Sequence, residues 1–467
     1  MKSKCLKTLN LLKVLSNTNW GGDRSSLLRL YRSLVKSKLD YGCIVYGSAR
    51  KSYLQMLDTI HHQGLRLALG AFRTSPVESL YVEANEPSLY VRREKLLLQY
   101  ATRVATNTNN PAHDVMFDPN LKELFDIKPK EIKPIGIRLQ SPLEQTNINP
   151  EYVAPIVTPE TPPWTMNTPK VIMDMCSFKK SECDSETYKA HFGEIRDRYN
   201  DFYAIYTDGS KDGENVGCAA VSKYHNSKQR LPDNASIFSA EVKAIDLALT
   251  FASTYTEDKF IIFSDSLSVL TSLKNRKTKN ALVQEILLKL DDICKSKEIV
   301  FCWIPSHIGI RGNEKADCAA KQSLNLPHSN VKLPFSDFKP SINKYVKGKW
   351  QTSWDGAIFN KLHSIKPILG DFNHGYRSSR REETVLTRCR IGHTRITHSY
   401  LLQREEQPEC IPCNEPFTVK HFLLDCVDLA LIRERYFNVG SLYDLFRTVS
   451  PDAILGFLKE SGVYNKI

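Results

Sequence analysis

The sequence lacks any long uncharged apolar stretch. No run of about 18 such residues occurs, so no segment is predicted to cross a membrane as a helix. The first ten residues contain lysines but are not followed by the apolar block of a secretion signal. From these two absences we expect an intracellular protein without a membrane partner.

A disulfide framework is also missing. The 12 cysteines of the 467 residues are mostly isolated in the sequence, whereas small secreted proteins concentrate theirs. The pair Cys410 and Cys413 is the exception. A hydrophobic content of 41% is sufficient for ordinary cores, and the length predicts a globular protein of about two to four domains.

The net charge of +12 is unevenly distributed. Residues 1–110 carry 17 basic and 7 acidic side chains, and residues 322–467 carry 20 and 15, whereas residues 201–321 carry 16 of each. Basic surface can serve solubility alone. An excess confined to two flanking segments also suggests nucleic acid as a partner.

Composition and periodicity divide the chain into four regions. Residues 1–110 are basic, and their apolar positions recur every three or four residues, which predicts helices. Residues 111–199 are expected to be a linker, since 11 of the 23 prolines fall within 111–169 and proline removes backbone donors. Residues 200–325 alternate between strand and helix patterns, and residues 326–467 form a helical tail with a Cys/His motif.

The third region predicts an α/β domain. A meander of three strands is followed by a helix, a strand, two helices, a strand and a last helix. Right-handed crossovers would build from these a mixed five-stranded sheet with flanking helices. The predicted strands are 201–208, 217–224, 228–232, 259–265 and 298–305, and the predicted helices are 236–254, 266–273, 280–294 and 313–324.

Acidic residues stand at comparable places in this domain. Asp208 and Asp265 end two predicted strands, Glu241 lies early in the first helix, and Asp317 lies in the last. Neighbouring parallel strands end at one crevice, so these side chains can converge. A single aspartate at a strand end is more often a turn former or helix cap. Converging carboxylates raise one another's pKa unless a cation binds. Ligand sets made only of oxygen favour Mg²⁺ or Mn²⁺, and two such ions can hydrolyse a phosphodiester.

The stretches YTDGS, FSAEVKAI, FSDSLSVL and IPSHIGIRGNEKADCAAK resemble the four signature blocks of type 1 ribonuclease H, in the family's order. The resemblance implies a ribonuclease H-like fold over 200–325. It places the family's catalytic, metal-binding carboxylates on Asp208, Glu241, Asp265 and Asp317. The family's loop histidine, which helps product release or proton movement, falls on His307. Without the flanking block, His307 would read as a loop hydrogen-bonder.

The resemblance further implies endonucleolytic, two-metal-ion hydrolysis of the RNA strand of RNA–DNA hybrids, with Mg²⁺ or Mn²⁺ as cofactor and no small-molecule cofactor. Asp208 and Asp265 would be shared between the ions, and Glu241 and Asp317 would each complete one site. Ser210 is a candidate backbone contact, although a turn-stabilising hydroxyl explains it equally well. In place of the family's long basic handle the chain has a short loop, whose basic residues we expect to contact nucleic acid: Lys274, Arg276, Lys277 and Lys279.

The flanking regions resemble a second family. LYRSLVKSKLDYGCIVYG and RCRIGHTRITHSYLL are similar to the region downstream of the polymerase core in non-LTR retrotransposon reverse transcriptases of the insect type. The chain would then be the C-terminal portion of such a polyprotein. The polymerase motif Tyr-x-Asp-Asp is absent, which predicts no polymerase activity here. An element that copies RNA at chromosomal DNA makes the nucleus a plausible location.

The tail contains a possible zinc site. Cys410, Cys413, His421 and Cys426 have the spacing of a zinc knuckle; three buried thiols and a capping histidine are the alternative. The middle spacing exceeds that of a retroviral knuckle, so metal is a firmer expectation than nucleic-acid contact. Three upstream residues could substitute as ligands: Cys389, His393 and His398. For the two histidines, packing or backbone contact is the favoured interpretation.

Arginines are also concentrated in the tail. They could contact phosphates or form a solvated face, because Glu382 and Glu383 lie among them. The cluster consists of Arg377, Arg380, Arg381, Arg388, Arg390 and Arg395.

These features together predict an RNA–DNA hybrid ribonuclease in a retrotransposon-derived protein. The alternative is a catalytically inactive, nucleic-acid-binding remnant of a retroelement that keeps the fold and binds through its basic flanks. A transposase or integrase on the same fold is disfavoured by Glu241 and by the block GNEKAD.

Overall fold

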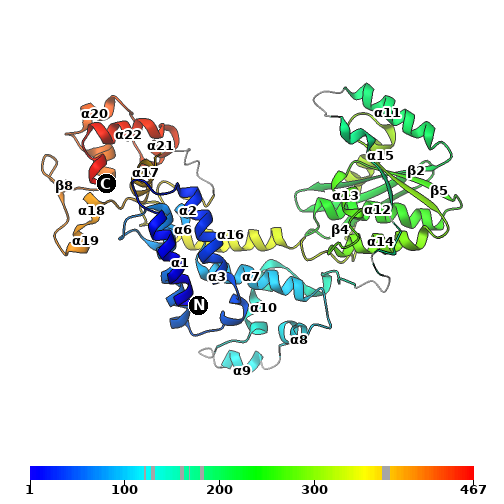
Figure 1. The fold of residues 1–467 in the computed structure, drawn as a ribbon, viewed down its shortest axis with the longest axis horizontal. Coiled ribbons are helices and arrows are strands. Elements are labelled where there is room, and N and C mark those ends of the chain that lie inside the picture. The colour runs from blue at the N-terminus through cyan, green and yellow to red at the C-terminus, as the bar shows by residue number, and fades with distance from the viewer. Residues whose placement is uncertain are drawn as a thin grey trace. The chain divides into compact units, whose positions relative to one another are not determined.

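The computed structural model describes residues 1–119, 122–127, 132–157, 162, 164–167, 169–178, 184–370 and 379–467. The chain forms two compact units, each drawn in Figure 1. The first unit contains Met1–Leu97, Glu123–Arg138 and Asn343–Ile467, and the second contains Leu98–Lys122 and Leu139–Ile342. Within the described ranges, no helix is both long and apolar enough to span a bilayer.

The second unit is built on a six-stranded sheet with the order β1-β6-β5-β2-β3-β4. The first four strands in this order are parallel, and β2, β3 and β4 form the antiparallel meander that the sequence predicts. The sheet is therefore mixed. Its strands are β1 (Lys170–Ile172), β2 (Tyr203–Asp212), β3 (Asn215–Ser222), β4 (Asn226–Leu231), β5 (Lys259–Ser264) and β6 (Glu298–Trp303).

The prediction of five strands is wrong by one. β1 comes from the segment that we expected to be a proline-rich linker, and its Val171 pairs with Phe301 of β6. A strand of three residues is too short to show an alternating pattern. Where it is described, the same segment is also largely helical, with α8 (Ala112–Phe117), α9 (Lys122–Ile127), α10 (Ile135–Thr146) and α11 (Ser185–Arg198).

Helices cover both faces of the sheet. On one face α12 (Ile237–Thr254), α13 (Leu267–Leu273) and α14 (Ala281–Ile293) pack over Phe260 and Ile262 of β5. On the other face α11 packs over Ile261 and Phe263, and α15 (Arg311–Ser323) packs over β3. Successive strand residues point to opposite faces, so a strand covered on both sides is apolar throughout, as β5 is.

The first unit combines both ends of the chain. Its N-terminal helices bury one apolar cluster around Tyr31 and Leu65, and a second cluster joins Val82 of α6 to Trp354 and Phe457 of the tail. The N-terminal elements are α1 (Lys2–Leu15), α2 (Arg24–Leu30), η1 (Tyr31–Lys36), α3 (Ser37–Asp40), α4 (Cys43–Tyr46), α5 (Lys51–Leu69), α6 (Val77–Ala84) and α7 (Leu89–Val104). The main tail elements are α16 (Lys339–Asp355), α17 (Arg380–Ile391), η4 (His421–Asp425), α20 (Ala430–Glu434), α21 (Leu442–Thr448) and α22 (Pro451–Glu460).

Arginines of α17 join the tail to the N-terminal helices. Arg390 donates to Oε1 of the fully buried Glu83 over 2.7 and 2.9 Å. Arg380 donates to the carbonyls of Leu67 and Ala68, where the last turn of α5 leaves acceptors without helical partners. Arg388 donates to the carbonyl of Gly70 over 2.9 Å.

The expected roles of the arginine cluster, phosphate contact or a solvated face, are therefore wrong for these three residues. Periodicity within α17 did not show that the partners of these arginines lie in α6 and at the end of α5, about 300 positions earlier in the sequence. Arg395 is exposed, and Arg377 lies outside the described residues.

Candidate functional site

Asp208 lies inside β2 and does not end it, contrary to the sequence prediction. β2 pairs with β5 only as far as Thr207 and Ser264, while its pairing with β3 continues to Asp212. Asp208 therefore stands at the point where the parallel pairing stops and the hairpin goes on. Its side chain is buried, with 6% of its surface exposed.

Glu241 reaches Asp208 because α12 lies unusually close to β2. A Cβ atom on Gly209 would stand 2.8 Å from the backbone nitrogen of Glu241 and 3.0 Å from the Cβ of Ala240. Only glycine leaves room for this approach. Glu241 is also buried, and its Oε2 has no hydrogen-bond partner among the described residues.

Asp265 and Asp317 come from the neighbouring strand and from α15. Asp265 follows β5 directly, and Asn313 of α15 donates to its Oδ2 over 3.4 Å. Trp303 of β6 donates from its indole nitrogen to the backbone carbonyl of Asp265 over 3.0 Å. Asp317 is half-buried and pairs with Lys321 one helical turn later, over 2.8 Å.

The structure places these carboxylates in two separate groups, three in one and Asp317 in the other. Ligand atoms of Asp208, Glu241 and Asp265 lie within 4.8 Å of one another. Asp317 lies within the same distance of Glu314 and His307, and its charge also acts on Asp208. Glu314 is a candidate that sequence reasoning missed, although its position three residues before Asp317 places both on one face of α15.

Burial and mutual repulsion change the acidity of this cluster. Burial, together with Asp265 and Asp317, raises the pKa of Asp208 to about 8. Burial followed by the charges of Asp208 and Asp265 raises the pKa of Glu241 well above its ordinary value. Burial also raises the pKa of Asp265, against the lowering effects of Asn313 and His307. Carboxylates this close can all be ionised only beside a cation.

The donor set fits a hard divalent cation. All four acidic side chains offer oxygen, which Mg²⁺ and Mn²⁺ prefer. The buried Oε2 of Glu241 and the buried Oδ1 of Asn313 have no hydrogen-bond partner in the described chain. A buried oxygen without a partner is costly, and coordination of an ion or its water would satisfy it.

His307 lies on the exposed loop between β6 and α15. Its φ of 57° is in the left-handed region, which is uncommon for a residue with a side chain. The loop brings its ring into the group with Glu314 and Asp317. The next glycine along, Gly309, donates from its backbone nitrogen to Glu314 over 3.4 Å.

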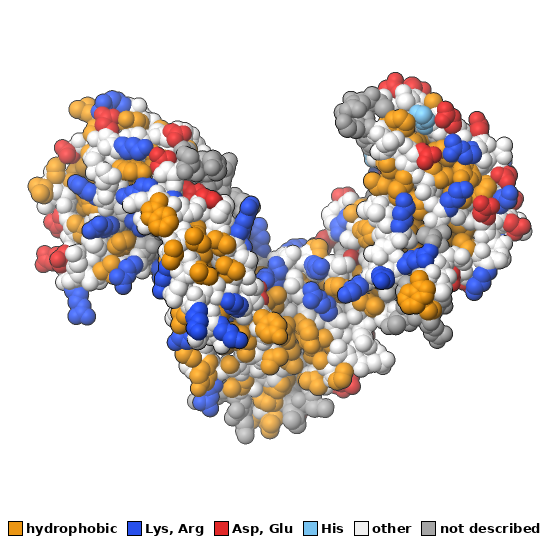
Figure 2. Space-filling view, in the orientation of Figure 1, with side chains coloured by type: hydrophobic (Ala, Val, Ile, Leu, Met, Phe, Trp, Pro, Cys, Tyr) orange, Lys and Arg blue, Asp and Glu red, His pale blue; other side chains and the backbone are white. Residues whose placement is uncertain are grey.

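The predicted nucleic-acid contacts are not members of the acidic groups. Ser210 is half-buried on β2, two residues beyond Asp208. The basic loop after α13 contacts residues on either side of β1, since Lys274 reaches the sulfur of Met173 over 3.3 Å and Arg276 donates to the carbonyl of Trp164 over 3.1 Å. Lys277 and Lys279 are exposed. Figure 2 shows Lys and Arg side chains on the visible faces of both units.

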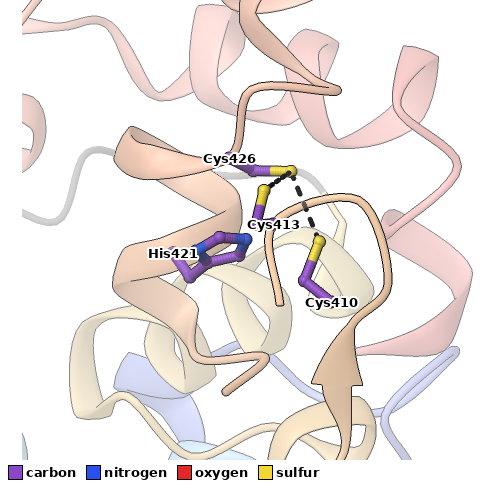
Figure 3. Close-up of side chains that lie close together, drawn as sticks. All are labelled: Cys410, Cys413, His421 and Cys426. Atoms are coloured by element: carbon purple, nitrogen blue, oxygen red, sulfur yellow. Dashed lines mark hydrogen bonds between the residues drawn. The ribbon is translucent and has the colours of Figure 1, made fainter. Parts of the chain in front are cut away.

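The four predicted zinc ligands of the tail lie together (Figure 3). The sulfur of Cys426 lies 3.8 Å from that of Cys410 and 3.9 Å from that of Cys413. Two thiolates on one tetrahedral zinc, each at about 2.3 Å, are about 3.8 Å apart. Neither ring nitrogen of the buried His421 makes a hydrogen bond within the described residues, and its Nδ1 lies 3.4 Å from the carboxylate of Glu415. The group therefore fits a structural zinc ion.

The alternative ligands Cys389, His393 and His398 have other contacts. Cys389 is fully buried in the apolar core of the tail. The rings of His393 and His398 stack at 3.7 Å. Thr74 and Lys361 contact these two histidines over 3.1 and 3.0 Å. The two histidines serve packing, as the favoured sequence interpretation predicted, and Cys389 belongs to the apolar core.

Comparison with known proteins supports the assignment of the central domain. Residues 200–325 match the RNase H family model. The chain is 28% identical over 142 residues to Ribonuclease H1 of Homo sapiens, which is 26% of this chain and 50% of that protein. It is 28% identical over 138 residues to Ribonuclease H1 of Rattus norvegicus, covering 25% of this chain and 48% of that protein. It is also 28% identical over 151 residues to Ribonuclease H of Rippkaea orientalis, covering 27% and 90%.

The chain thus spans about half the length of the mammalian relatives it matches. Residues 200–325 form an RNase H domain, and the mixed α/β sheet with flanking helices is consistent with the RNase H fold.

Proposed function

We propose that this protein hydrolyses the RNA strand of RNA–DNA hybrids endonucleolytically, through its RNase H domain. The observation that carries the proposal is the convergence of Asp208, Glu241 and Asp265 within 4.8 Å, on a domain that matches the RNase H family. Asp317 adds a fourth carboxylate from α15, and its charge acts on Asp208.

The four carboxylates would hold two Mg²⁺ or Mn²⁺ ions. When bound, such a pair supplies an activated water and stabilises the leaving oxygen of the phosphodiester. The chain's own contribution is to hold the ligands in place. Asn313 orients Asp265 through its side-chain amide, and α12 presents Glu241 against Gly209.

His307 would assist proton movement or product release. Its loop position is exposed, and its ring nevertheless lies within 4.8 Å of Asp317 and Glu314, so it can meet both solvent and substrate. Neutral imidazole near a phosphodiester can accept a proton at ordinary pH.

Substrate would be recognised by shape and backbone. Duplexes that contain RNA offer little readable base sequence, so recognition uses 2′-hydroxyls and phosphates. Ser210 would contact the backbone near Asp208, and the basic loop Lys274, Arg276, Lys277 and Lys279 would contact phosphates farther along.

The tail would bind zinc through Cys410, Cys413, His421 and Cys426, which supports its fold. We further propose that the chain derives from the C-terminal portion of a non-LTR retrotransposon polyprotein and works in the nucleus. The resemblance of its flanking sequences supports this origin. An upstream Tyr-x-Asp-Asp motif in the same genomic reading frame would strengthen it, and an intron-containing host gene without one would contradict it.

Asp208→Asn tests the catalytic proposal. The variant keeps the side-chain shape but removes an anionic ligand, so we expect hybrid cleavage to fall by more than about 100-fold, beyond the cost of losing an outer-shell partner. Mg²⁺-dependent cleavage of a labelled hybrid measures the loss, and circular dichroism checks the fold. Wild-type turnover in this variant would refute the assignment. Wild-type protein that binds the hybrid but never cuts it would favour the inactive remnant.

A further inference from the structure

The segment after the RNase H match folds back onto the same unit. Ser329 donates from its backbone nitrogen to the carbonyl of Arg230 in β4 over 3.0 Å. Leu333 donates to the carbonyl of Tyr152 over 2.8 Å, and Ala154 donates back to Leu333 over 2.7 Å. Residues 326–342 are therefore part of the second unit and run from the edge strand β4 toward the start of α12.

Asp337 of this segment lies at the first turn of α12. The backbone nitrogen of Ser236 donates to its Oδ2 over 3.0 Å, and the Ser236 hydroxyl donates to its Oδ1 over 3.2 Å. Ser236 is the N-cap of α12, and its Oγ accepts a hydrogen bond from the backbone nitrogen of Ser239. Asp337 is 5% exposed. The amino end of a helix carries partial positive charge, which favours a carboxylate. Burial nevertheless raises the pKa of Asp337, against the lowering effects of its hydrogen bonds with Ser236 and Ser239.

Other contacts hold the entry to α12 from two sides. Lys211 of β2 donates to the carbonyl of Ala235 over 2.8 Å. Ser341, four residues after Asp337, donates to the side chain of Asn234. The short stretch before α12 is therefore fixed both by the sheet and by the segment that returns after the RNase H match.

This end of α12 leads directly to the acidic cluster. Glu241 lies five residues after Ser236, and its backbone nitrogen is the atom that a Cβ on Gly209 would contact. α12 and β2 therefore approach so closely at Gly209 that no larger residue fits there. A small shift or rotation of the first turn would move the Glu241 carboxylate relative to Asp208 and Asp265.

We propose that Asp337 is a positioning residue for Glu241, so that the functional RNase H domain extends past residue 325 to include the segment 326–342. The inference rests on the proposed function for its effect on cleavage. Its effect on metal affinity is independent of cleavage, because a misplaced Glu241 weakens the metal site whether or not the protein cuts hybrid.

The test compares three proteins as full chains. Asp337→Asn keeps the side-chain volume but replaces one acceptor oxygen with an NH₂ group. This donor would face a donor of Ser236 and could not accept its hydrogen bond. Asp246→Asn is the matched control, since Asp246 lies on the same helix and pairs with Lys243 and Lys289 over 2.9 and 2.8 Å. Mn²⁺ affinity is measured by calorimetry, and kcat and KM for the hybrid are measured below the unfolding temperature of each protein.

We expect Asp337→Asn to weaken Mn²⁺ binding and lower kcat by about tenfold, the lower end for an outer-shell partner, with KM for the hybrid unchanged. Asp246→Asn should lower thermal stability alone. Wild-type Mn²⁺ affinity in Asp337→Asn, or equal losses in both variants, would overturn the proposal. If Asp337→Asn does not fold, Ser236→Gly, which removes the hydroxyl contacts to Asp337 and to the backbone nitrogen of Ser239 but keeps the backbone contact to Asp337, must weaken Mn²⁺ binding in the same direction, and unchanged affinity there would overturn it too. Wild-type protein that binds Mn²⁺ without cleaving hybrid would count against the proposed function only.

Discussion

The two candidate metal sites differ in how the chain assembles them. The Cys/His group draws its four ligands from a stretch between Cys410 and Cys426, so local turns suffice to build it. The carboxylates come from β2, α12, the end of β5 and α15, and only the folded sheet brings them together. The first is a compact soft-ligand site that fits zinc, and the second is an all-oxygen site that fits Mg²⁺.

The two sites therefore suit different roles: the Cys/His group suits stabilisation of the fold, and the acidic group suits catalysis. A closed set of four protein ligands leaves no position for substrate, which is typical of structural zinc. The acidic site has buried oxygens that find no hydrogen-bond partner among the described residues and carboxyls whose pKa values are raised, so it is costly for the apo protein. Strongly perturbed pKa values are typical of functional sites.

Selective removal of each metal should produce the largest effect. Without Mg²⁺ or Mn²⁺ we expect no hybrid cleavage and an unchanged fold, because the sheet core is apolar. Removal of zinc by a selective chelator should leave cleavage intact and lower the unfolding temperature of the first unit. Cleavage assays and differential scanning calorimetry measure both. Cleavage that disappears on zinc removal, with Mg²⁺ present, would contradict this assignment of roles.

Cys426→Ser should destabilise the tail. Zinc at about 1,000 times its dissociation constant stabilises a folded protein by about 4 kcal/mol, and this contribution disappears with a missing thiolate. Zinc content by mass spectrometry and chemical denaturation give the result. Cys318→Ser, at an exposed thiol on α15, is the matched control and should change neither. Full zinc occupancy in Cys426→Ser would exclude this ligand set.

Gly209→Ala should push α12 away from β2. The new Cβ would stand 2.8 Å from the nitrogen of Glu241, and overpacking typically costs about 1–3 kcal/mol. We expect lower stability of the second unit. We also expect weaker Mg²⁺ binding, so that cleavage requires a higher Mg²⁺ concentration. Gly193→Ala in α11 is the control, because apart from the adjoining residues and backbone of α11 itself no atom of the described residues lies within 4 Å of its added Cβ, and alanine favours a helix. Wild-type cleavage by Gly209→Ala would show that the close approach is not required.

Replacing the basic loop should have the smallest effect. Changing Lys274, Arg276, Lys277 and Lys279 to serine leaves the acidic site untouched, so kcat should be unchanged while KM rises. The slope of log affinity against log salt should fall by roughly 0.9 for each phosphate that the loop no longer neutralises. Steady-state kinetics at several salt concentrations measure this, and an unchanged salt slope would place the nucleic-acid interface elsewhere.

Local sequence patterns predicted the central domain well. Apolar runs, such as the one ending at Asp265, and turn signals predicted five of the six strands, and their order placed three of the acids, Asp208, Glu241 and Asp265, where the folded domain groups them. The sequence could not show that β2 continues beyond Asp208, since the extension depends on pairing with β3 alone.

Local sequence patterns could not predict the contacts between segments that are far apart in the sequence. Arg390 looks like surface charge in its own helix, yet its partner Glu83 lies in α6. Asp337 was not singled out, because its helix cap belongs to a residue about 100 positions earlier. Glu314 could have been found from its spacing to Asp317 within one helix.

The buried pairing of Arg390 with Glu83 also sets an order of events during synthesis. The N-terminal helices leave the ribosome long before α17 exists, so Glu83 lies in an incomplete unit at that stage. All six strands of the RNase H sheet lie between Lys170 and Trp303, so the sheet can already form. A nascent chain paused before residue 380 would therefore contain a complete RNase H domain while the first unit is still incomplete. Limited proteolysis of stalled chains would reveal that asymmetry.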